Sequence, residues 1–188
     1  MIITLARECG CQGDLIGLEL AKMYQLPFYD RKKVSDLIRS KGTLDRFPDF
    51  YGENPVDTLS YSILLAEDDQ ALYKRPKQGE IMPEDDFILL GRCGNYAYCD
   101  REDALRIFLM GQVEQRVETI AKKHGVSVRK AKETVKETDE RRRAYHLRYT
   151  GQDWGYAGNY DLCLNVSRLG TQGVMEAIQT AVRTITDH

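Results

Sequence analysis

The first seventeen residues, MIITLARECGCQGDLIG, constrain the fold more than any other stretch of this chain. A short apolar run at residues 2–6 ends at Arg7, glycines follow at positions 10, 13 and 17, and an amphipathic run begins near Leu15. This order predicts a strand, a glycine turn and a helix, the layout that directs backbone amides and a helix N-terminus toward an oxyanion. The lysine of the phosphate-binding motif GxxxxGK[ST] is absent, so the same turn also fits a tight connection that binds nothing.

Strand-like and helical patterns alternate about five times along the 188 residues. Runs typical of buried strands lie near residues 2–6, 27–29, 87–91, 105–110 and 161–166. Helical spacing occurs from residue 15 to before Pro27, over 32–39, around 59–66, over 112–124, from an N-cap at Ser127 to Tyr149, and at the C-terminus. This alternation predicts an α/β fold with a parallel sheet between two layers of helices. Ligands of such sheets bind beyond the carboxyl ends of the strands.

Composition narrows the class of protein. The chain is 42% hydrophobic and 30% charged, as in an ordinary globular domain, and its net charge of −2 argues against bulk nucleic-acid binding. No apolar segment approaches the roughly 20 residues of a membrane helix. Five cysteines, an odd number, lie in or beside predicted core elements, which favours a reduced, cytoplasmic protein.

Charged residues directly follow three of the predicted strands, namely Arg7-Glu8, Asp30-Arg31 and Arg92. Because the carboxyl ends of parallel strands meet at one edge of the sheet, these side chains would surround one opening. In the glycine turn, Gly10 and Gly13 permit a positive φ and a close approach of amides to an oxyanion, and Arg7 could add a positive charge. Arginine and aspartate are also common in loops without a ligand, so both interpretations stay open.

The predicted long helix carries two faces rich in arginine. Helical spacing groups Asp139, Arg142, Arg143 and His146 on one face and Arg141, Tyr145 and Arg148 on a neighbouring one. Guanidinium groups bind phosphate oxygens in pairs and stabilise the charge on a phosphoryl group in transfer. The alternative is a solvated helix with ion pairs such as Glu137–Arg141 and Asp139–Arg143.

Two smaller features have structural interpretations. Cys9 and Cys11 form a C-x-C pair that could bind a metal or act in redox chemistry, but no second cysteine pair or histidine pair completes a ligand set. We therefore interpret Cys9 and Cys11 as small residues of the loop. Trp154, Tyr156 and Tyr160 are expected to pack beneath the segment that follows the long helix.

Several pieces of the chain, in this order, resemble one family. They are ITLARECGCQGDLIG, LPFYDRK, ILLGRCGNY, LRIFLMG with VEQRVETIAKKHGVS, and TDERRRAYHLRYTGQDWG with NYDLCLNVSRLG. Together they resemble the cytidylate kinase-like proteins, a branch of the P-loop nucleoside monophosphate kinases. The resemblance covers nearly the whole chain. It implies a three-layer α/β sandwich of P-loop NTPase type, with a five-stranded parallel sheet in the order 2-3-1-4-5. It also implies a core at residues 1–30 and 86–188, an acceptor-binding insertion at about 31–85 and a helical lid at about 138–156.

The resemblance also implies site residues. It places Gly10, Cys11, Gln12, Gly13 and Asp14 in the phosphate-binding loop, Asp30 and Arg92 at the acceptor, and Asp139, Arg141, Arg142 and Arg143 in the lid over the donor phosphates. It implies ATP as the donor, Mg²⁺ as the accompanying ion, and CMP, dCMP or a similar small acceptor. No residue is assigned as a metal ligand, and a homodimer is compatible with the amphipathic helices.

The chain departs from the family at the loop. Gly13 stands where the well-characterised cytidylate kinases have lysine, and Asp14 lies where related members offer an arginine. An anionic side chain beside a bound triphosphate would repel it unless Mg²⁺ lay between them. Arg7, reaching back from the strand end, is our hypothesis for the missing charge. Two functions follow: a phosphotransferase, or a catalytically weak or inactive nucleotide-binding or sensing protein on the same fold.

Overall fold

The computed structural model describes residues 1–41, 82 and 85–186. The helix predicted around residues 59–66 and most of the predicted acceptor-binding insertion lie outside these described residues. Within the described part of the chain, no helix is long and apolar enough to cross a membrane.

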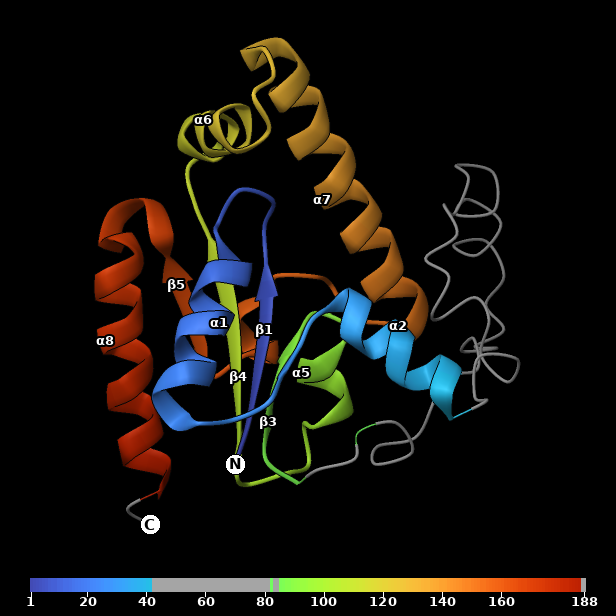
Figure 1. Cartoon of the computed structure of the whole chain (residues 1–188), viewed down its shortest axis with the longest axis vertical. Helices are drawn as coiled ribbons and strands as arrows, with labels where there is room; N and C mark the ends of the chain where they lie inside the picture. The colour runs from blue at the N-terminus through green and yellow to red at the C-terminus, as the bar shows by residue number, and fades with distance from the viewer. Residues whose placement is uncertain (42–81, 83–84, 187–188) are drawn as a thin grey trace.

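A five-stranded parallel sheet forms the centre of the molecule (Figure 1). Its strands are β1 (Ile2–Arg7), β2 (Phe28–Tyr29), β3 (Phe87–Leu90), β4 (Ala104–Met110) and β5 (Leu162–Asn165). Their order is β2-β3-β1-β4-β5, and the central residue Leu5 pairs with Leu90 on one side and Ile107 on the other. The predicted fold class and strand order are therefore confirmed, and each strand ends within one residue of its predicted range.

Among the described residues, the helices follow the predicted alternation with two short additions. They are α1 (Gly13–Tyr24), α2 (Arg31–Ser40), α5 (Gly94–Ala97), α6 (Val113–His124), α7 (Val128–Thr150), the 3-10 turn η2 (Ala157–Asn159) and α8 (Val166–Thr186). The sequence did not predict α5, because a helix of four residues is too short to show a 3.6-residue period. The helical assignment of α8 begins directly after β5 and spans a break at Gly170, where φ is 68°.

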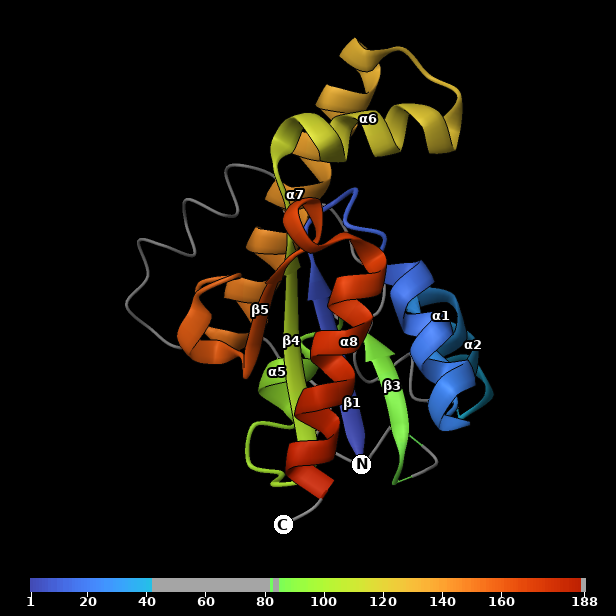
Figure 2. The ribbon, with the colours of Figure 1, turned by 90° about the vertical axis from the view of Figure 1, so that its left-hand side faces the viewer.

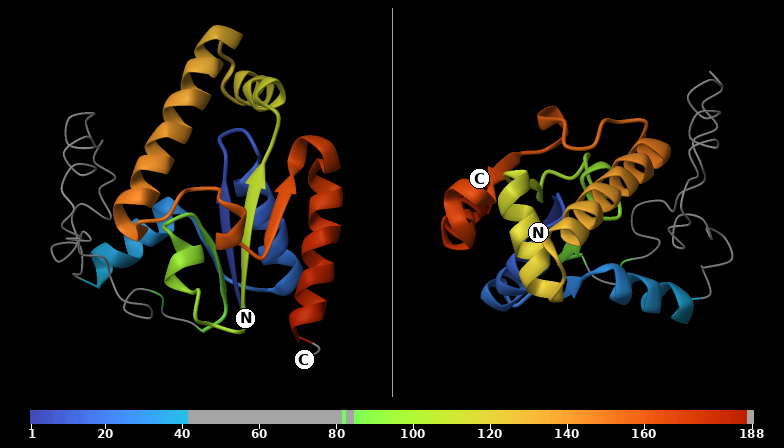
Figure 3. Two further views of the ribbon diagram at one scale, coloured as in Figure 1. Left: turned by 180° about the vertical axis from the view of Figure 1, so that it is seen from behind. Right: turned by 90° about the horizontal axis from the view of Figure 1, so that it is seen from above.

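Two hydrophobic cores make the sheet the middle layer of three. On one face, Ile16 and Leu20 of α1 and Ile178 of α8 pack against the sheet. On the other face, Val34 of α2 and Tyr149 of α7 pack against it together with α5. Apart from Thr4, residues 2–6 of β1 and all of β3 are apolar on both faces because both faces are covered, as is usual for parallel sheets. Figure 2 and Figure 3 show these helical layers from the side, from behind and from above.

A third, smaller core joins α6 and α7 into a hairpin. Its members are Cys9, Val117, Ile120, Ala131 and Val135. The hairpin lies above the carboxyl ends of the central strands, and α7 then runs down toward the face that carries α2 and α5 (Figure 1). Because Cys9 belongs to the glycine turn, this core packs the turn against the hairpin.

Candidate functional site

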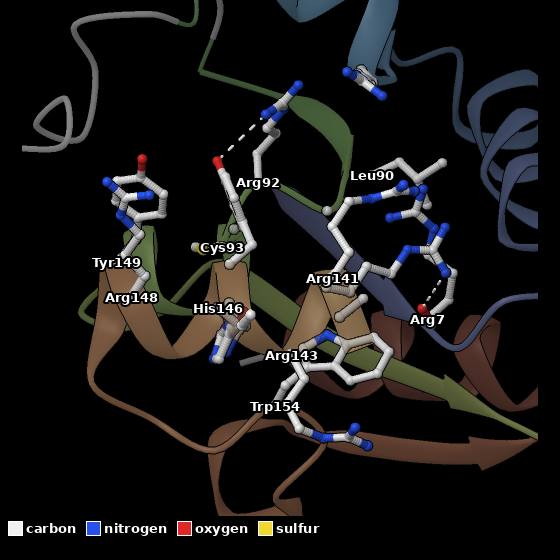
Figure 4. A pocket seen from close by; sticks show the side chains of 18 of the residues that line it. Arg7, Leu90, Arg92, Cys93, Arg141, Arg143, His146, Arg148, Tyr149 and Trp154 are labelled. Carbon is white, nitrogen blue, oxygen red and sulfur yellow. Dashed lines mark hydrogen bonds between the residues drawn. The ribbon is translucent and has the colours of Figure 1, made fainter. Parts of the chain in front are cut away.

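A cavity of about 630 Å³ opens at the carboxyl ends of β1 and β3, beneath α7. Its charged side chains are Arg7, Arg31, Arg92, Arg141, Arg142, Arg143, Arg148, Glu137 and Glu140. Seven arginines against two glutamates leave an excess of five positive charges in the lining of a chain whose net charge is −2. Such a concentration of one sign attracts anionic ligands. Figure 4 shows Arg7, Arg92, Arg141 and Arg143 gathered around this space.

The Arg7 side chain lies between two glycine turns at the carboxyl end of the sheet. Its side chain passes so close to Gly13 and Gly91 that a Cβ would lie 2.9 Å from Arg7 Cγ at the first and 2.8 Å from Arg7 Nη1 at the second. Arg142 Nη1 donates a hydrogen bond to the Arg7 carbonyl oxygen at 3.0 Å. Arg7 therefore lies between the glycine loop and the turn after β3, the place from which it could supply positive charge to a bound phosphate. Its catalytic role stays a prediction.

The turn after β3 holds Arg92 in an unusual conformation. Gly91, Arg92 and Cys93 have φ values of 81°, 56° and 54°. The left-handed region costs a residue other than glycine about 1–2 kcal/mol, so two such residues in a row require support from their surroundings. Arg92 is only 9% exposed, and its Nη1 donates to Tyr145 Oη of α7 at 3.4 Å. The turn thus places the Arg92 guanidinium in contact with α7 at the wall of the cavity.

The arginines of α7 share the cavity but have different neighbours. Arg143 lies over the ring of Trp154, with its Cζ 5.8 Å from the ring centroid. Trp154 in turn packs edge-on against Phe108 of β4, at 5.3 Å between centroids, so it is both a packing residue, as expected, and part of the cavity wall. The alternative ion pairs Glu137–Arg141 and Asp139–Arg143 do not form among these described residues. The arginine faces of α7 therefore turn toward the cavity.

The predicted lid is part of a continuous helix. Residues 138–150 belong to α7, which runs without interruption from Val128 and buries Ala131, Val135 and Tyr149. Gly151 ends the helix with a φ of 68°. The arginines of the predicted lid therefore lie on the same continuous helix as the α6–α7 hairpin. The lid boundaries of 138–156 stay a prediction.

The glycine loop is near the cavity but does not line it. Gly10 has a φ of 91°, as the glycine pattern predicted, but the second left-handed residue is Gln12, the N-cap of α1, with a φ of 54°. Gly13 is helical, and its missing side chain instead makes room for Arg7. Residues 10–14 are absent from the described lining. The carboxylate of Asp139 accepts a hydrogen bond from the Cys9 amide at 2.7 Å, which places Asp139 behind the loop rather than in the cavity. The phosphate-binding role of residues 10–14 stays a prediction.

The acidic residue of the loop has a cationic partner that the sequence did not reveal. Asp14 forms an ion pair with Lys123 at the end of α6. Burial alone would raise the pKa of the Asp14 carboxyl, but the hydrogen bond and charge of Lys123 outweigh it and the pKa lies below its usual value. The negative charge expected to repel a triphosphate is thus balanced within the protein.

Asp30 serves as a helix cap. Its Oδ1 accepts a hydrogen bond from the Lys33 amide at 2.9 Å, which stabilises the start of α2. The next residue, Arg31, lines the cavity, whereas Asp30 does not. The predicted acceptor contact of Asp30 stays a prediction, and Arg31 is the cavity residue at this strand end.

The cysteines of the loop are not placed for thiolate chemistry. Cys11 is 1% exposed and Cys9 is 7% exposed. Burial raises the pKa of both thiols, that of Cys11 to about 12, so both are protonated near neutral pH. Among the described residues, no group of three or more histidine, cysteine, aspartate or glutamate side chains could hold a metal ion. The C-x-C pair is therefore a packing element of the loop.

His146 is a buried, neutral histidine on the wall of the cavity. It is 3% exposed, and burial lowers its pKa to about 4. Its Nε2 makes no hydrogen bond with the described residues. Because a neutral imidazole adds no charge, the positive potential of the cavity comes from the arginines.

Sequence reasoning missed Arg116, which holds the loop from α6. It lies six residues after the end of β4, in the first turn of α6, at the same edge of the sheet as Arg7. A search of all residues within two turns of each strand end would have found it. Its partner Asp139 could not have been paired with it by sequence alone, because 23 residues separate them.

Comparison with known proteins identifies the family. The sequence model of the cytidylate kinase-like family matches residues 2–168. The chain belongs to the cytidylate kinase-like family. Curated relatives in this comparison include the cytidylate kinases of Pyrococcus horikoshii and Natronomonas pharaonis. Each is 28% identical over 184 residues, or 97% of this chain, and these residues cover 88% and 89% of the two relatives.

A solved structure shows the same fold. The crystal structure of an uncharacterized protein from Eubacterium ventriosum aligns with a TM-score of 0.72 and 20% identity, over 98% of both chains. The family predicted from the sequence is thus confirmed, and this structural likeness supports the fold alone. Across the family match, the glycine loop, the Arg92 turn and the arginines of α7 all lie within residues 2–168.

Proposed function

We propose that this protein transfers a phosphoryl group from ATP to a nucleoside monophosphate such as CMP or dCMP, or to a similar small acceptor. The observation that carries the proposal is the cavity with seven arginines at the carboxyl ends of β1 and β3. Membership of the cytidylate kinase-like family and curated relatives named cytidylate kinase support a nucleotide kinase-type function. A nucleoside monophosphate carries about two negative charges at its phosphate, which an arginine-lined site binds through paired hydrogen bonds.

The proposed roles divide the cavity and the neighbouring glycine loop into an acceptor side and a donor side. Arg92 and Arg31, after β3 and β2, would bind the acceptor, together with the insertion that is proposed to span residues 31–85. Residues 10–14 and the arginines of α7 would hold the donor phosphates, with 138–156 as the lid. Arg7 lies between the two sides, where the transferring phosphoryl group would pass. Its fixed guanidinium would stabilise the charge that spreads over the phosphoryl oxygens during in-line transfer, without a covalent enzyme intermediate.

Mg²⁺, which accompanies ATP in this family, has no evident protein ligand set in the described residues. No group of three or more candidate ligands occurs there, and Asp14 is engaged by Lys123. Glu8 accepts a hydrogen bond from the Gly111 amide at 2.9 Å. The described residues thus offer no cluster that would hold Mg²⁺ by protein ligands alone; the ion would arrive with ATP, bound to its phosphates and to water, and the roles derived for this chain are those of its arginines.

Two observations favour a second function. The loop lacks its lysine, and the Cys9 amide is already bound by a protein carboxylate. A nucleotide-binding or sensing protein without turnover would have these features and keep the arginine cavity. In both cases the partners are a nucleotide and, for the kinase, a small acceptor; the homodimer and the cytoplasmic location stay predictions.

A coupled assay with ATP, Mg²⁺ and each common ribo- and deoxyribonucleoside monophosphate tests the proposal. We expect turnover with CMP or dCMP. The Arg7→Ala variant should lower kcat by about 100-fold or more, because it removes a charge directed at the transition state. The matched control is Arg129→Ala, since Arg129 lies on α7 with its side chain 91% exposed and outside the cavity.

The outcomes separate the two functions. No turnover above the blank with any acceptor, together with a nucleotide-dependent rise in Tm, would reject the kinase and support the nucleotide-binding protein. Neither turnover nor a rise in Tm would remove both. Turnover that Arg7→Ala leaves unchanged would keep the kinase and reject Arg7 as its catalytic charge.

A further inference from the structure

The glycine loop is held from behind by a buried ion pair between α6 and α7. Arg116 is 6% exposed and Asp139 is 9% exposed, and Arg116 Nη1 donates to Asp139 Oδ2 at 2.6 Å. The same pair binds both backbone groups of Cys9. Asp139 Oδ1 accepts from the Cys9 amide at 2.7 Å, and Arg116 Nη1 donates to the Cys9 carbonyl oxygen at 3.1 Å.

Further contacts join the loop to the hairpin around this pair. Arg116 Nε donates to the Gly111 carbonyl oxygen at 3.0 Å, which fixes the guanidinium at the end of β4. A Cβ on Gly10 would lie 2.5 Å from the backbone oxygen of Arg116, so loop and helix are in direct contact. The Cys9 side chain completes the hydrophobic core of the α6–α7 hairpin. The loop and the hairpin are therefore one packed unit.

Asp139 also links the position of the α7 arginines to that of the glycine loop. It precedes Arg142 by one helical turn, and Arg142 Nη1 donates to the carbonyl oxygen of Arg7, the last residue before the loop. Arg141 and Arg143 line the cavity beside it, whereas neither Arg116 nor Asp139 does. The contact of Asp139 with the loop thus fixes the spacing between the loop amides and the cavity arginines.

A second connection between loop and hairpin is weak by comparison. The pair of Asp14 and Lys123 is 52% exposed at both side chains, and exposed pairs are screened by water and salt. The Arg116–Asp139 pair is buried in a charged network. Glu8 Oε2 lies 3.4 Å from Arg116 Nε, and Arg142 Nη1 lies 3.8 Å from Asp139 Oδ1, so separating the pair would disrupt several buried contacts at once. The buried pair therefore carries the coupling.

We propose that Arg116 and Asp139 are positioning residues for the donor nucleotide. They hold the glycine loop and the arginines of α7 at one spacing, so that the donor phosphates meet both at once. The inference rests on the proposed function and assigns Asp139 an indirect role, through Cys9 and Arg116, in place of a contact with the reacting atoms.

Conservative variants test this proposal because each one changes the charge or the hydrogen bonds of the pair while keeping a side chain of similar size. Asp139→Asn keeps an oxygen for the Cys9 amide but presents an uncharged group to Arg116, and Arg116→Lys keeps the charge but loses the contact with Gly111. The matched control is Glu133→Gln, the same carboxylate-to-amide change on α7 in an exposed pair with Arg129 at 3.4 Å. Since small displacements of reacting groups cost up to about 100-fold, we expect the KM for ATP to rise about tenfold or more in both variants. The KM for the acceptor should stay within about twofold in the variants and in the control.

Two readouts keep the inference falsifiable. In an active enzyme, an unchanged KM for ATP, or an equal rise in the KM for the acceptor, would overturn it in favour of a purely structural pair. If the wild type shows no turnover, the proposed function fails, and calorimetric titration with ATP and amide exchange over residues 8–13 test the pair directly. Faster exchange and weaker ATP binding in Asp139→Asn, but not in Glu133→Gln, would support it. Unchanged exchange would reject it.

Discussion

His146 should make the stability of this protein depend on pH between about 6.5 and 4. Burial lowers its pKa from 6.5 to about 4 in the folded protein. Between these values the unfolded chain binds a proton that the folded chain does not, so the free energy of unfolding falls as the pH falls. Each unit of difference is worth about 1.4 kcal/mol, so the whole window is worth about 3 kcal/mol. Above pH 6.5 the imidazole is neutral in both states and adds no further dependence.

Urea unfolding at pH 7.0, 5.5 and 4.5 measures this effect in the wild type, in His146→Gln and in His124→Gln. His124 is the control because it is exposed at the end of α6. Ion-paired carboxyls whose pKa is lowered, such as Asp161 beside Arg106, also lose their contribution to stability in acid, but mainly below pH 4, and all three proteins share that loss. Both proteins should lose free energy of unfolding between pH 7.0 and 4.5. We expect the loss to be smaller in His146→Gln than in the wild type, by most of the about 3 kcal/mol attributed to His146.

Parallel pH dependence in the wild type and His146→Gln would refute the reasoning. It would mean that the folded protein admits the proton at His146 without cost, for instance through water reaching Nε2 from the cavity that the side chain lines. The same dependence in His124→Gln as in the wild type is required for the comparison to hold.

Two further predictions concern the loop. Gly10→Ala combines a φ of 91° with a Cβ 2.5 Å from the backbone of Arg116, and thermal unfolding should show a loss of more than about 2 kcal/mol. Gly125→Ala, at a φ of 62° with nothing within 4 Å of the new Cβ, should cost only the backbone strain of about 1 kcal/mol; equal losses would contradict the contact with α6. Iodoacetamide at pH 8 should alkylate the exposed Cys163 in the native protein but leave Cys11 unmodified until urea is added, as measured by peptide mass spectrometry. Early modification of Cys11 would show that its thiol is not buried as described.

The sequence by itself determined the five strands, the longer helices of the described residues and the family of this protein. Apolar runs near residues 87–91 and 105–110 predicted buried strands, and Ser127 predicted the start of α7, where its Oγ accepts from the Lys130 amide at 3.2 Å. These features depend on neighbours within a few residues, and such local signals are written directly in the order of the chain. The strand order followed from the family resemblance, and the structure confirmed it.

Only the tertiary structure decided which charges meet. Asp14 and Lys123 are 109 residues apart in the chain, and Asp139 and the Cys9 amide are 130 residues apart. Sequence spacing correctly put Asp139 and His146 on one face of α7, yet it could not show that the first holds the glycine loop while the second is buried and neutral. The reason is that burial and pairing depend on the faces that the α6–α7 hairpin and the sheet present to each other. That arrangement packs a lysine-free glycine loop against the α6–α7 hairpin and turns the arginines of α7 toward a cavity beside it.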